Sequence, residues 1–184
     1  MGRRRALASS SGYAIFDIKA GPEVRAARIV DAIKAGLQKG TTQVQIVNSI
    51  PPSPLPDTPG RFQLASPLKG SGLASVAATA AQSLLMPTCE GAIMTANARD
   101  SSMNRYGEAT TFFACLMPYR DGYALNVYTT FTKASGAFNS AVLAATLMRP
   151  VTGDSAQFIP RTIGYMVEGI KQTGAKVNLL EAYP

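Results

Sequence analysis

The sequence predicts a single α+β domain, made of an N-terminal βαβ unit, an antiparallel β-meander, helices packed on the sheet and a C-terminal strand. Two observations support this prediction. Strand-like and helix-like patterns alternate only over residues 13–47, whereas three strand-like runs follow one another between residues 90 and 132. With 184 residues, of which 46% are apolar, the chain is long enough to bury one sizeable core.

The first fifty residues predict the βαβ unit. Residues 13–18 are rich in strand-forming side chains, and residues 42–47 alternate polar and apolar side chains as a strand does. Between them, apolar residues recur at helical spacing ahead of a glycine stop: Ala26, Val30, Ile33 and Leu37. If the two strands are neighbours in the sheet, their connection is expected to be parallel and right-handed.

Five prolines in residues 51–60 exclude a helix or a central strand from this segment. We expect a stiff strap that crosses the surface of the domain. The other interpretation is a polyproline-type docking segment, in which a protein partner contacts Pro51, Pro52, Pro54 and Pro56.

The middle of the chain predicts a helix and then the meander. Residues 72–86 are apolar and rich in alanine, which favours a packed helix. Three strand-like runs predict the meander: residues 90–98, 109–117 and 123–132. Two helices and a strand are expected to complete the chain, at residues 137–148, 154–172 and 175–180.

A hairpin turn is predicted at Asp121-Gly122, because an Asp-Gly pair between two strand-like runs is a strong turn signal. A two-residue turn there would place Phe112 opposite Phe131 on the face that we expect to cover the core. The opposite face would carry a second, partly apolar set: Phe113, Cys115, Asn126 and Tyr128. Both faces of the sheet are therefore expected to be partly covered.

Cys89 and Cys115 are the two cysteines of the chain, and we expect them to form a disulfide. If the loop between the first two strands of the meander is centred near Ser101 and Ser102, the cysteines lie opposite each other, at the separation that a disulfide requires. Disulfides persist in oxidising compartments, so this pairing favours an exported protein. The other interpretation is two buried free thiols.

Residues 1–12 predict a flexible basic arm, and residues 13–184 predict the domain itself. Arg3, Arg4 and Arg5 supply three of the positive charges in a net charge of +7, and they are candidate contacts for an anion. The remaining basic residues are scattered along the chain, which is typical of an ordinary solvated surface.

The start of the chain combines basic residues with a small-residue triplet, Ala6, Leu7 and Ala8, that resembles a signal-peptide cleavage site. The apolar region of a signal peptide is missing. We therefore expect either a cytosolic protein or a shortened form of an exported protein, which includes the case of a lost lipid anchor. No apolar run is long enough for a transmembrane helix, so none is expected.

Histidine is absent from the sequence, which excludes a Ser-His-Asp triad, a Cys-His dyad and every zinc site that uses imidazole. Two cysteines cannot form a four-cysteine site. The glycine pair Gly70 and Gly72 precedes a predicted helix but lacks the lysine of a phosphate-binding loop. We expect no metal and no cofactor.

Asp17 is the carboxylate that the sequence explains least, because it lies within an apolar strand. An ion pair with a nearby arginine explains it more simply than general-base catalysis. Together with Glu108, it is the basis of a third hypothesis, in which the protein is a small hydrolase or transferase.

A polar loop between the first two strands of the meander is the best candidate binding surface, because loops on a rigid sheet often carry recognition. Its candidate partner contacts are Arg99, Asp100, Asn104, Arg105, Tyr106 and Glu108. The predicted function is a non-enzymatic binding or assembly subunit of a bacterial cell-envelope complex, periplasmic or attached to the surface, with a protein partner or further copies of itself. The alternative is a cytosolic protein that binds nucleic acid or an anionic surface through its arginine-rich start.

Overall fold

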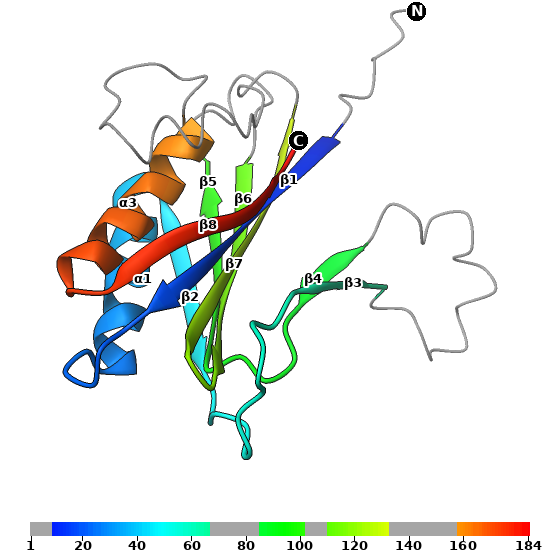
Figure 1. The fold of residues 1–184 in the computed structure, drawn as a ribbon. Coiled ribbons are helices and arrows are strands. Elements are labelled where there is room, and N and C mark those ends of the chain that lie inside the picture. Colours follow the sequence, from blue (N-terminus) through cyan, green and yellow to red (C-terminus); the bar gives the residue numbers. More distant parts are fainter. Residues whose placement is uncertain (1–8, 67–84, 102–109, 133–157) are drawn as a thin grey trace, which may run out of the picture.

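Six antiparallel strands form a sheet that carries two helices on one face and a two-stranded hairpin on the other (Figure 1). The structure is a computed structural model that describes residues 9–66, 85–101, 110–132 and 158–184. Its elements are β1 (Ser9–Lys19), α1 (Ala26–Gly40), β2 (Gln43–Asn48), β3 (Gln63–Ala65), β4 (Met86–Thr88), β5 (Met94–Asp100), β6 (Thr110–Tyr119), β7 (Gly122–Thr132), α3 (Phe158–Gln172) and β8 (Lys176–Tyr183). The helix expected at residues 72–86 lies almost wholly outside the described residues, and the helix expected at residues 137–148 lies wholly outside them.

The order of strands in the sheet is β2-β5-β6-β7-β1-β8, and every neighbouring pair is antiparallel. The predicted α+β class, with its βαβ start, its meander β5–β6–β7 and its C-terminal strand, is confirmed. The two strands of the βαβ unit run in the same direction but are not neighbours, because the whole meander lies between β1 and β2. Residues 9–12, which the sequence assigned to the basic arm, belong to strand β1.

The turn between β6 and β7 lies at Arg120 and Asp121, one position earlier than predicted. Gly122 is the first residue of β7, with a φ of +157°, and a Cβ atom on it would collide with the carbonyl oxygen of Ile18. Gly122 is not part of the turn, and the close approach of β1 is the reason for a glycine at this position. Phe112 consequently faces Thr129 rather than Phe131. The shift in register is two residues, so every side chain keeps the face that was predicted for it.

The core lies between the sheet and the two helices. Alternate strand residues such as Phe16, Phe112 and Leu125 point towards the helices and are buried. The helices bury apolar residues at helical spacing, which in α1 are Ile29, Ile33 and Leu37 and in α3 are Ile159, Ile163, Met166, Val167 and Ile170. Within the described ranges, neither helix has the length and apolar content needed to cross a bilayer.

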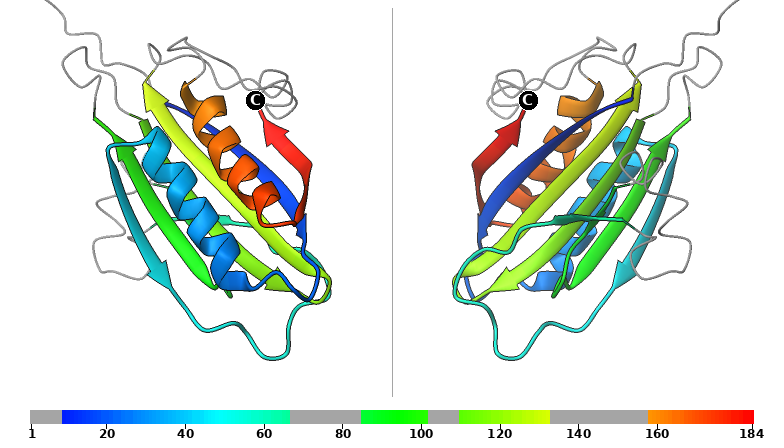
Figure 2. Two further views of the ribbon diagram at one scale, coloured as in Figure 1. Left: turned by 90° about the vertical axis from the view of Figure 1, so that its left-hand side faces the viewer. Right: turned by 90° about the vertical axis from the view of Figure 1, so that its right-hand side faces the viewer.

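α1 and α3 lie side by side across the sheet, in close contact (Figure 2). Gly36 of α1 is buried against the backbone of Met166, and a Cβ atom at position 36 would lie 2.5 Å from the Met166 nitrogen. On the other helix, Gly169 faces the carbonyl oxygen of Ala32 in the same way, at 3.2 Å. Small residues on both helices thus allow the two backbones to approach closely.

We predict that Gly36→Val destabilises the fold by about 1–3 kcal/mol, because the added side chain has to displace the backbone of α3. The matched control is Ala35→Val at the exposed neighbouring position, where only the lower helix propensity of valine acts, at less than about 0.7 kcal/mol. Urea unfolding of the two variants and the wild-type protein measures both changes. Equal losses in the two variants would contradict the close contact between the helices.

Candidate functional site

The face of the sheet that points away from the helices, here called the outer face, has a regular arrangement of side chains. Since neighbouring strands pair residue by residue, the outward side chains form rows across the sheet. One row is Gln43, Arg99, Thr111, Thr130 and Ser11. The next row is Gln45, Asn97, Phe113, Tyr128 and Tyr13. The first row is entirely polar, and the second changes from amide to aromatic side chains along its length.

Part of the outer face is covered by the chain that runs from β2 to β3 (Figure 2, right). The side chain of Asn126, buried on β7, holds this segment: its Oδ1 accepts a hydrogen bond from the Phe62 N–H at 3.2 Å, and its Nδ2 donates to the Gly60 carbonyl at 3.1 Å. The Phe62 ring then packs between Tyr13 and Tyr128, with ring centroids 5.4 and 5.5 Å apart. One amide side chain thus makes the backbone hydrogen bonds that a neighbouring strand would otherwise make with this segment.

A disulfide between Cys89 and Cys115 attaches the β3–β4 hairpin to the outer face, with the two Cα atoms 6.5 Å apart. The predicted bond is present, but the register predicted for it is wrong. In the β5–β6 ladder, Cys115 faces Thr95, whereas Cys89 directly follows β4 and belongs to the covering layer. The reason is that β5 begins only at Met94, so Cys89 lies outside that strand.

The disulfide is surrounded by a small apolar cluster of its own, separate from the main core. Cys115 is fully buried there with Ala92, Met117 and Ala124, and Phe113 packs against the cluster. The covering layer is therefore held by a covalent bond, by the Asn126 amide and by apolar contacts.

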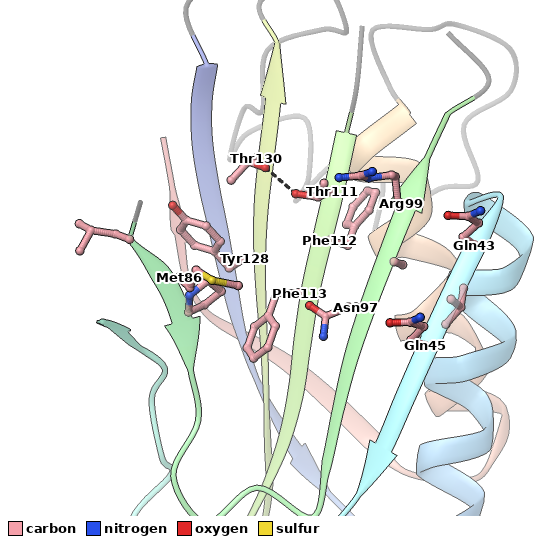
Figure 3. A pocket seen from close by; sticks show the side chains of 14 residues that line it. Gln43, Gln45, Met86, Asn97, Arg99, Thr111, Phe112, Phe113, Tyr128 and Thr130 are labelled. Atoms are coloured by element: carbon pink, nitrogen blue, oxygen red, sulfur yellow. Dashed lines mark hydrogen bonds between the residues drawn. The ribbon is translucent and has the colours of Figure 1, made fainter. Parts of the chain in front are cut away.

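Beside the covered part, the outer face remains open in a cavity of about 850 Å³ between β4 and the strands β2, β5, β6 and β7 (Figure 3). We call this cavity the outer-face groove. Its outward-facing lining is Gln43, Gln45, Met86, Asn97, Arg99, Thr111, Phe113, Tyr128 and Thr130. Four strands and the covering hairpin contribute to it, so the groove exists only in the folded sheet.

The polar groups of the groove are mostly uncharged. The side chains of Gln43, Gln45, Asn97 and Arg99 are exposed and make no hydrogen bond or ion pair within the part of the chain that the structure describes. Of the lining residues in the described part of the chain, Arg99 alone carries a charge. The amides thus offer free donors and acceptors to a bound molecule.

The apolar part of the groove is half-buried and fixed in place. Phe113 and Tyr128 lie directly opposite each other on β6 and β7. The neighbouring pair, Thr111 and Thr130, is joined by a hydrogen bond of 2.5 Å between the two hydroxyls (Figure 3). The groove therefore combines an aromatic floor with neutral hydrogen-bonding groups, and no acidic side chain is among its described lining residues.

The sequence-predicted partner contacts do not form one site. Arg99 lies in the groove, but Asp100 points to the other face of the sheet and is buried. Asn104, Arg105, Tyr106 and Glu108 lie outside the described residues, as do Arg3, Arg4 and Arg5. The segment that contains Pro51, Pro52, Pro54 and Pro56 lies near the opposite end of β5 from Arg99 (Figure 1).

The proline-rich segment contacts the turn between β6 and β7. The Arg120 N–H donates a hydrogen bond of 2.8 Å to the Pro56 carbonyl, and the Arg120 guanidinium forms a 2.6 Å ion pair with Asp57. Pro51, Pro54 and Pro56 are exposed, while Pro52 is half-buried. These contacts are those of a strap across the end of the sheet.

Asp17 lies in a hydrogen-bonded cluster with Lys19 and Tyr119. The Tyr119 hydroxyl donates to Asp17 and accepts from the Lys19 ammonium, whose nitrogen is 3.6 Å from the second Asp17 oxygen. Burial, and then the hydrogen bond to Asp17, raise the pKa of Tyr119, so this tyrosine keeps its proton at neutral pH. The cation that pairs with Asp17 is a lysine and not the arginine that we expected. These contacts give Asp17 a structural role that links β1 to the end of β6.

A second cluster joins the covering layer to the C-terminal strand. Glu181 accepts a hydrogen bond of 2.5 Å from the Tyr13 hydroxyl and forms an ion pair with Arg61, which directly precedes Phe62. The hydrogen bond from Tyr13, together with the one from Arg61, lowers the pKa of Glu181. The same bond to Glu181, with some burial, raises the pKa of Tyr13.

Sequence reasoning missed most of the groove. Alternation in the strands placed Phe113 and Tyr128 on the correct face, and the same alternation separates Gln43 and Gln45 from their apolar neighbours. The missing information was the pairing of β2 with β5, which brings these glutamines beside Asn97 and Arg99.

We predict that removing the disulfide lowers the free energy of unfolding by about 3 kcal/mol, since the bond closes a loop between residues 26 positions apart. The measurement is urea unfolding of a Cys89→Ala/Cys115→Ala variant. The matched control is wild-type protein under reductant, which keeps both side chains in place and should lose about the same amount. A loss of less than about 1 kcal/mol in both would mean that the bond does not hold the layer.

We predict that Glu181 stabilises the fold at neutral pH and ceases to do so in acid. Because its pKa is lowered in the folded state, its contribution is present above the ordinary carboxyl pKa and is lost as the pH falls through the lowered value. The gap in urea midpoint between wild type and Glu181→Gln should therefore shrink from pH 7 to pH 3. The control is Glu90→Gln at an exposed position, which should show no such gap. A gap for Glu181→Gln that is the same at both pH values would contradict the cluster.

No family model, no curated protein and no solved structure matches this chain.

Proposed function

We propose that the chain is a non-enzymatic binding or assembly subunit of a bacterial cell-envelope complex, and that it holds a partner in the outer-face groove. One observation carries this proposal. A disulfide-attached layer covers one part of the outer face, and the neighbouring part is left open, with amide side chains that have no partner among the described residues above an aromatic floor. An open, preformed cavity with a few converging polar groups is the usual form of a binding site.

The disulfide supports the location, periplasmic or at the cell surface. Such bonds form and persist in oxidising compartments and are rare in the cytosol. Both cysteines of the chain are used in this bond, which is compatible with a structural role.

The chemistry of the groove favours an extended, uncharged segment of another protein as the partner. Such a segment presents one N–H and one C=O per residue, which match the free donors and acceptors of Gln43, Gln45 and Asn97. An apolar side chain of the partner would cover Phe113 and Tyr128. Because Gln43, Gln45 and Asn97 are neutral, their desolvation costs less than that of charged groups.

Nucleic acid suits the groove less well. Single-stranded nucleic acid binds over aromatic side chains, but it also needs a row of cations along its backbone. Among the described residues that line the groove, Arg99 alone is positively charged. Salt-dependent binding of an oligonucleotide is thus the outcome that would favour the alternative function.

The groove is prepared for binding before a partner arrives. The Thr111–Thr130 hydrogen bond, the disulfide beside Phe113 and the Phe62 contact with Tyr128 all fix lining residues or their neighbours. Groups that are already ordered lose little conformational entropy when a partner binds, which favours affinity.

We predict that Asn97→Ala weakens partner binding about fivefold, which corresponds to one lost hydrogen bond. The probe is a library of uncharged seven-residue peptides, whose tightest binders are measured by fluorescence anisotropy. The control is Asn178→Ala, which removes an exposed amide from β8, outside the groove. Equal affinity in Asn97→Ala and wild type, or tighter binding of a single-stranded oligonucleotide than of any peptide, would contradict the proposed function.

A further inference from the structure

β2 is an edge strand with one unpaired side. It pairs with β5 on one side, and no strand lies on its other side among residues 9–66, 85–101, 110–132 and 158–184. The Ser49 N–H donates to the Ile93 carbonyl at 2.8 Å, in line with the register of the ladder. Since inward and outward backbone groups alternate along an antiparallel strand, Val44, Ile46 and Asn48 direct their N–H and C=O groups outward.

β2 itself lacks the charges and prolines that normally prevent an edge strand from pairing with a second chain. Its six residues, Gln-Val-Gln-Ile-Val-Asn, include no charge and no proline. Val47 is 60% exposed, and Ile50, just beyond the strand, is 89% exposed. An uncharged edge strand with β-branched residues is a typical site of strand addition.

The other edge of the sheet differs in these respects. β8 begins with Lys176 and carries Glu181, which is engaged with Tyr13 and Arg61. Its pairing with β1 also contains a β-bulge between Ile15 and Phe16. Charges and bulges are the usual protections of an edge, so the two edges are not equivalent.

We propose that two copies of this chain pair through antiparallel β2 strands, about a two-fold axis perpendicular to the sheet. The dimer would join the two sheets into one continuous sheet. Its helices would all lie on one face and both outer-face grooves on the other, because directly paired residues point to the same side.

A second copy fits this edge in two registers, because β2 carries no charge that would meet a like charge on the other copy. With the axis at Ile46, Val44 faces Asn48 and Gln45 faces Val47 of the other copy. With the axis at Gln45, the two Gln45 side chains face each other and Val44 faces Ile46. Neither register opposes like charges, and in both of them Val47 gains a neighbour on the partner strand.

The dimer would also extend the groove. Gln43 and Gln45 line the groove at its β2 end, which is the end that the two-fold axis places next to the partner. With the axis at Gln45, the partner's Gln45 would continue the row of Gln45 and Asn97 across the axis, and with the axis at Ile46 the partner's Val47 would take that place. The pairing itself does not depend on what occupies the groove, so its test is separate from the peptide experiment.

Sedimentation velocity over a range of protein concentrations tests the proposal. Wild type is expected to form a dimer. Gln45→Lys/Val47→Lys is expected to weaken dimerisation about thirtyfold, since either register then places cations directly opposite each other. Both side chains are exposed in the monomer, and urea unfolding confirms that the variant is folded.

Two further proteins make the test specific to β2. Leu180→Lys places a cation at an exposed position of β8 and is expected to dimerise like wild type. A mixture of the lysine variant with Gln45→Glu/Val47→Glu is expected to restore dimers, because unlike charges then face each other. A wild type that stays monomeric, a lysine variant that dimerises normally, or a mixture that fails to recover would each overturn the proposal.

Discussion

A sheet with helices on only one face has a second face that is either covered by other parts of the chain or exposed to solvent. The structure of this protein depends on which parts of that second face are covered. The bond from Cys115 to Cys89 and the amide of Asn126 hold a layer of chain over part of it. Ile15, which points to this face, is buried, and Phe62 of the layer packs against Tyr128. The same layer, through β4, forms one wall of the groove beside it.

The covered and open parts of the outer face differ in side-chain chemistry as well as in position. Where the layer lies, the sheet carries apolar residues and an amide whose hydrogen bonds are internal. Where the face is open, the amides of Gln45 and Asn97 have no partner within the described residues. Buried polar groups need partners within the protein, whereas exposed ones are satisfied by water until a ligand replaces it. The groove therefore does not weaken the fold in the absence of a partner.

Much of the fold could be predicted from local patterns, because strands and helices have characteristic periods. The helix with Ile33 and Leu37, the meander and the final strand were all visible in this way. The predicted hairpin register differs from the observed one by two residues. Gly122 is required by the close approach of Ile18, and no local sequence pattern reveals that contact. The disulfide was predicted from a register that does not occur. The two cysteines are nevertheless bonded, and the bond joins the covering layer to the sheet instead of joining two neighbouring strands.

The groove was not predictable, for a related physical reason. It depends on the pairing of residues 43–48 with residues 94–100, a contact between segments that are far apart in the sequence. Many strand orders are compatible with the same local patterns, and only the packing of the whole sheet selects one of them. The polar loop was predicted as the binding surface from its local composition. Of its described residues, only Arg99 lies in the groove.

The position of the disulfide in the chain has a consequence for proteolysis. The bond joins residues 26 positions apart, so the backbone between them is part of a covalent ring. Hydrolysis of any one peptide bond within the ring leaves both fragments attached to each other through sulfur. In a compartment that contains proteases but no strong reductant, a molecule nicked once in this region would keep all its strands and would separate into two pieces only after reduction.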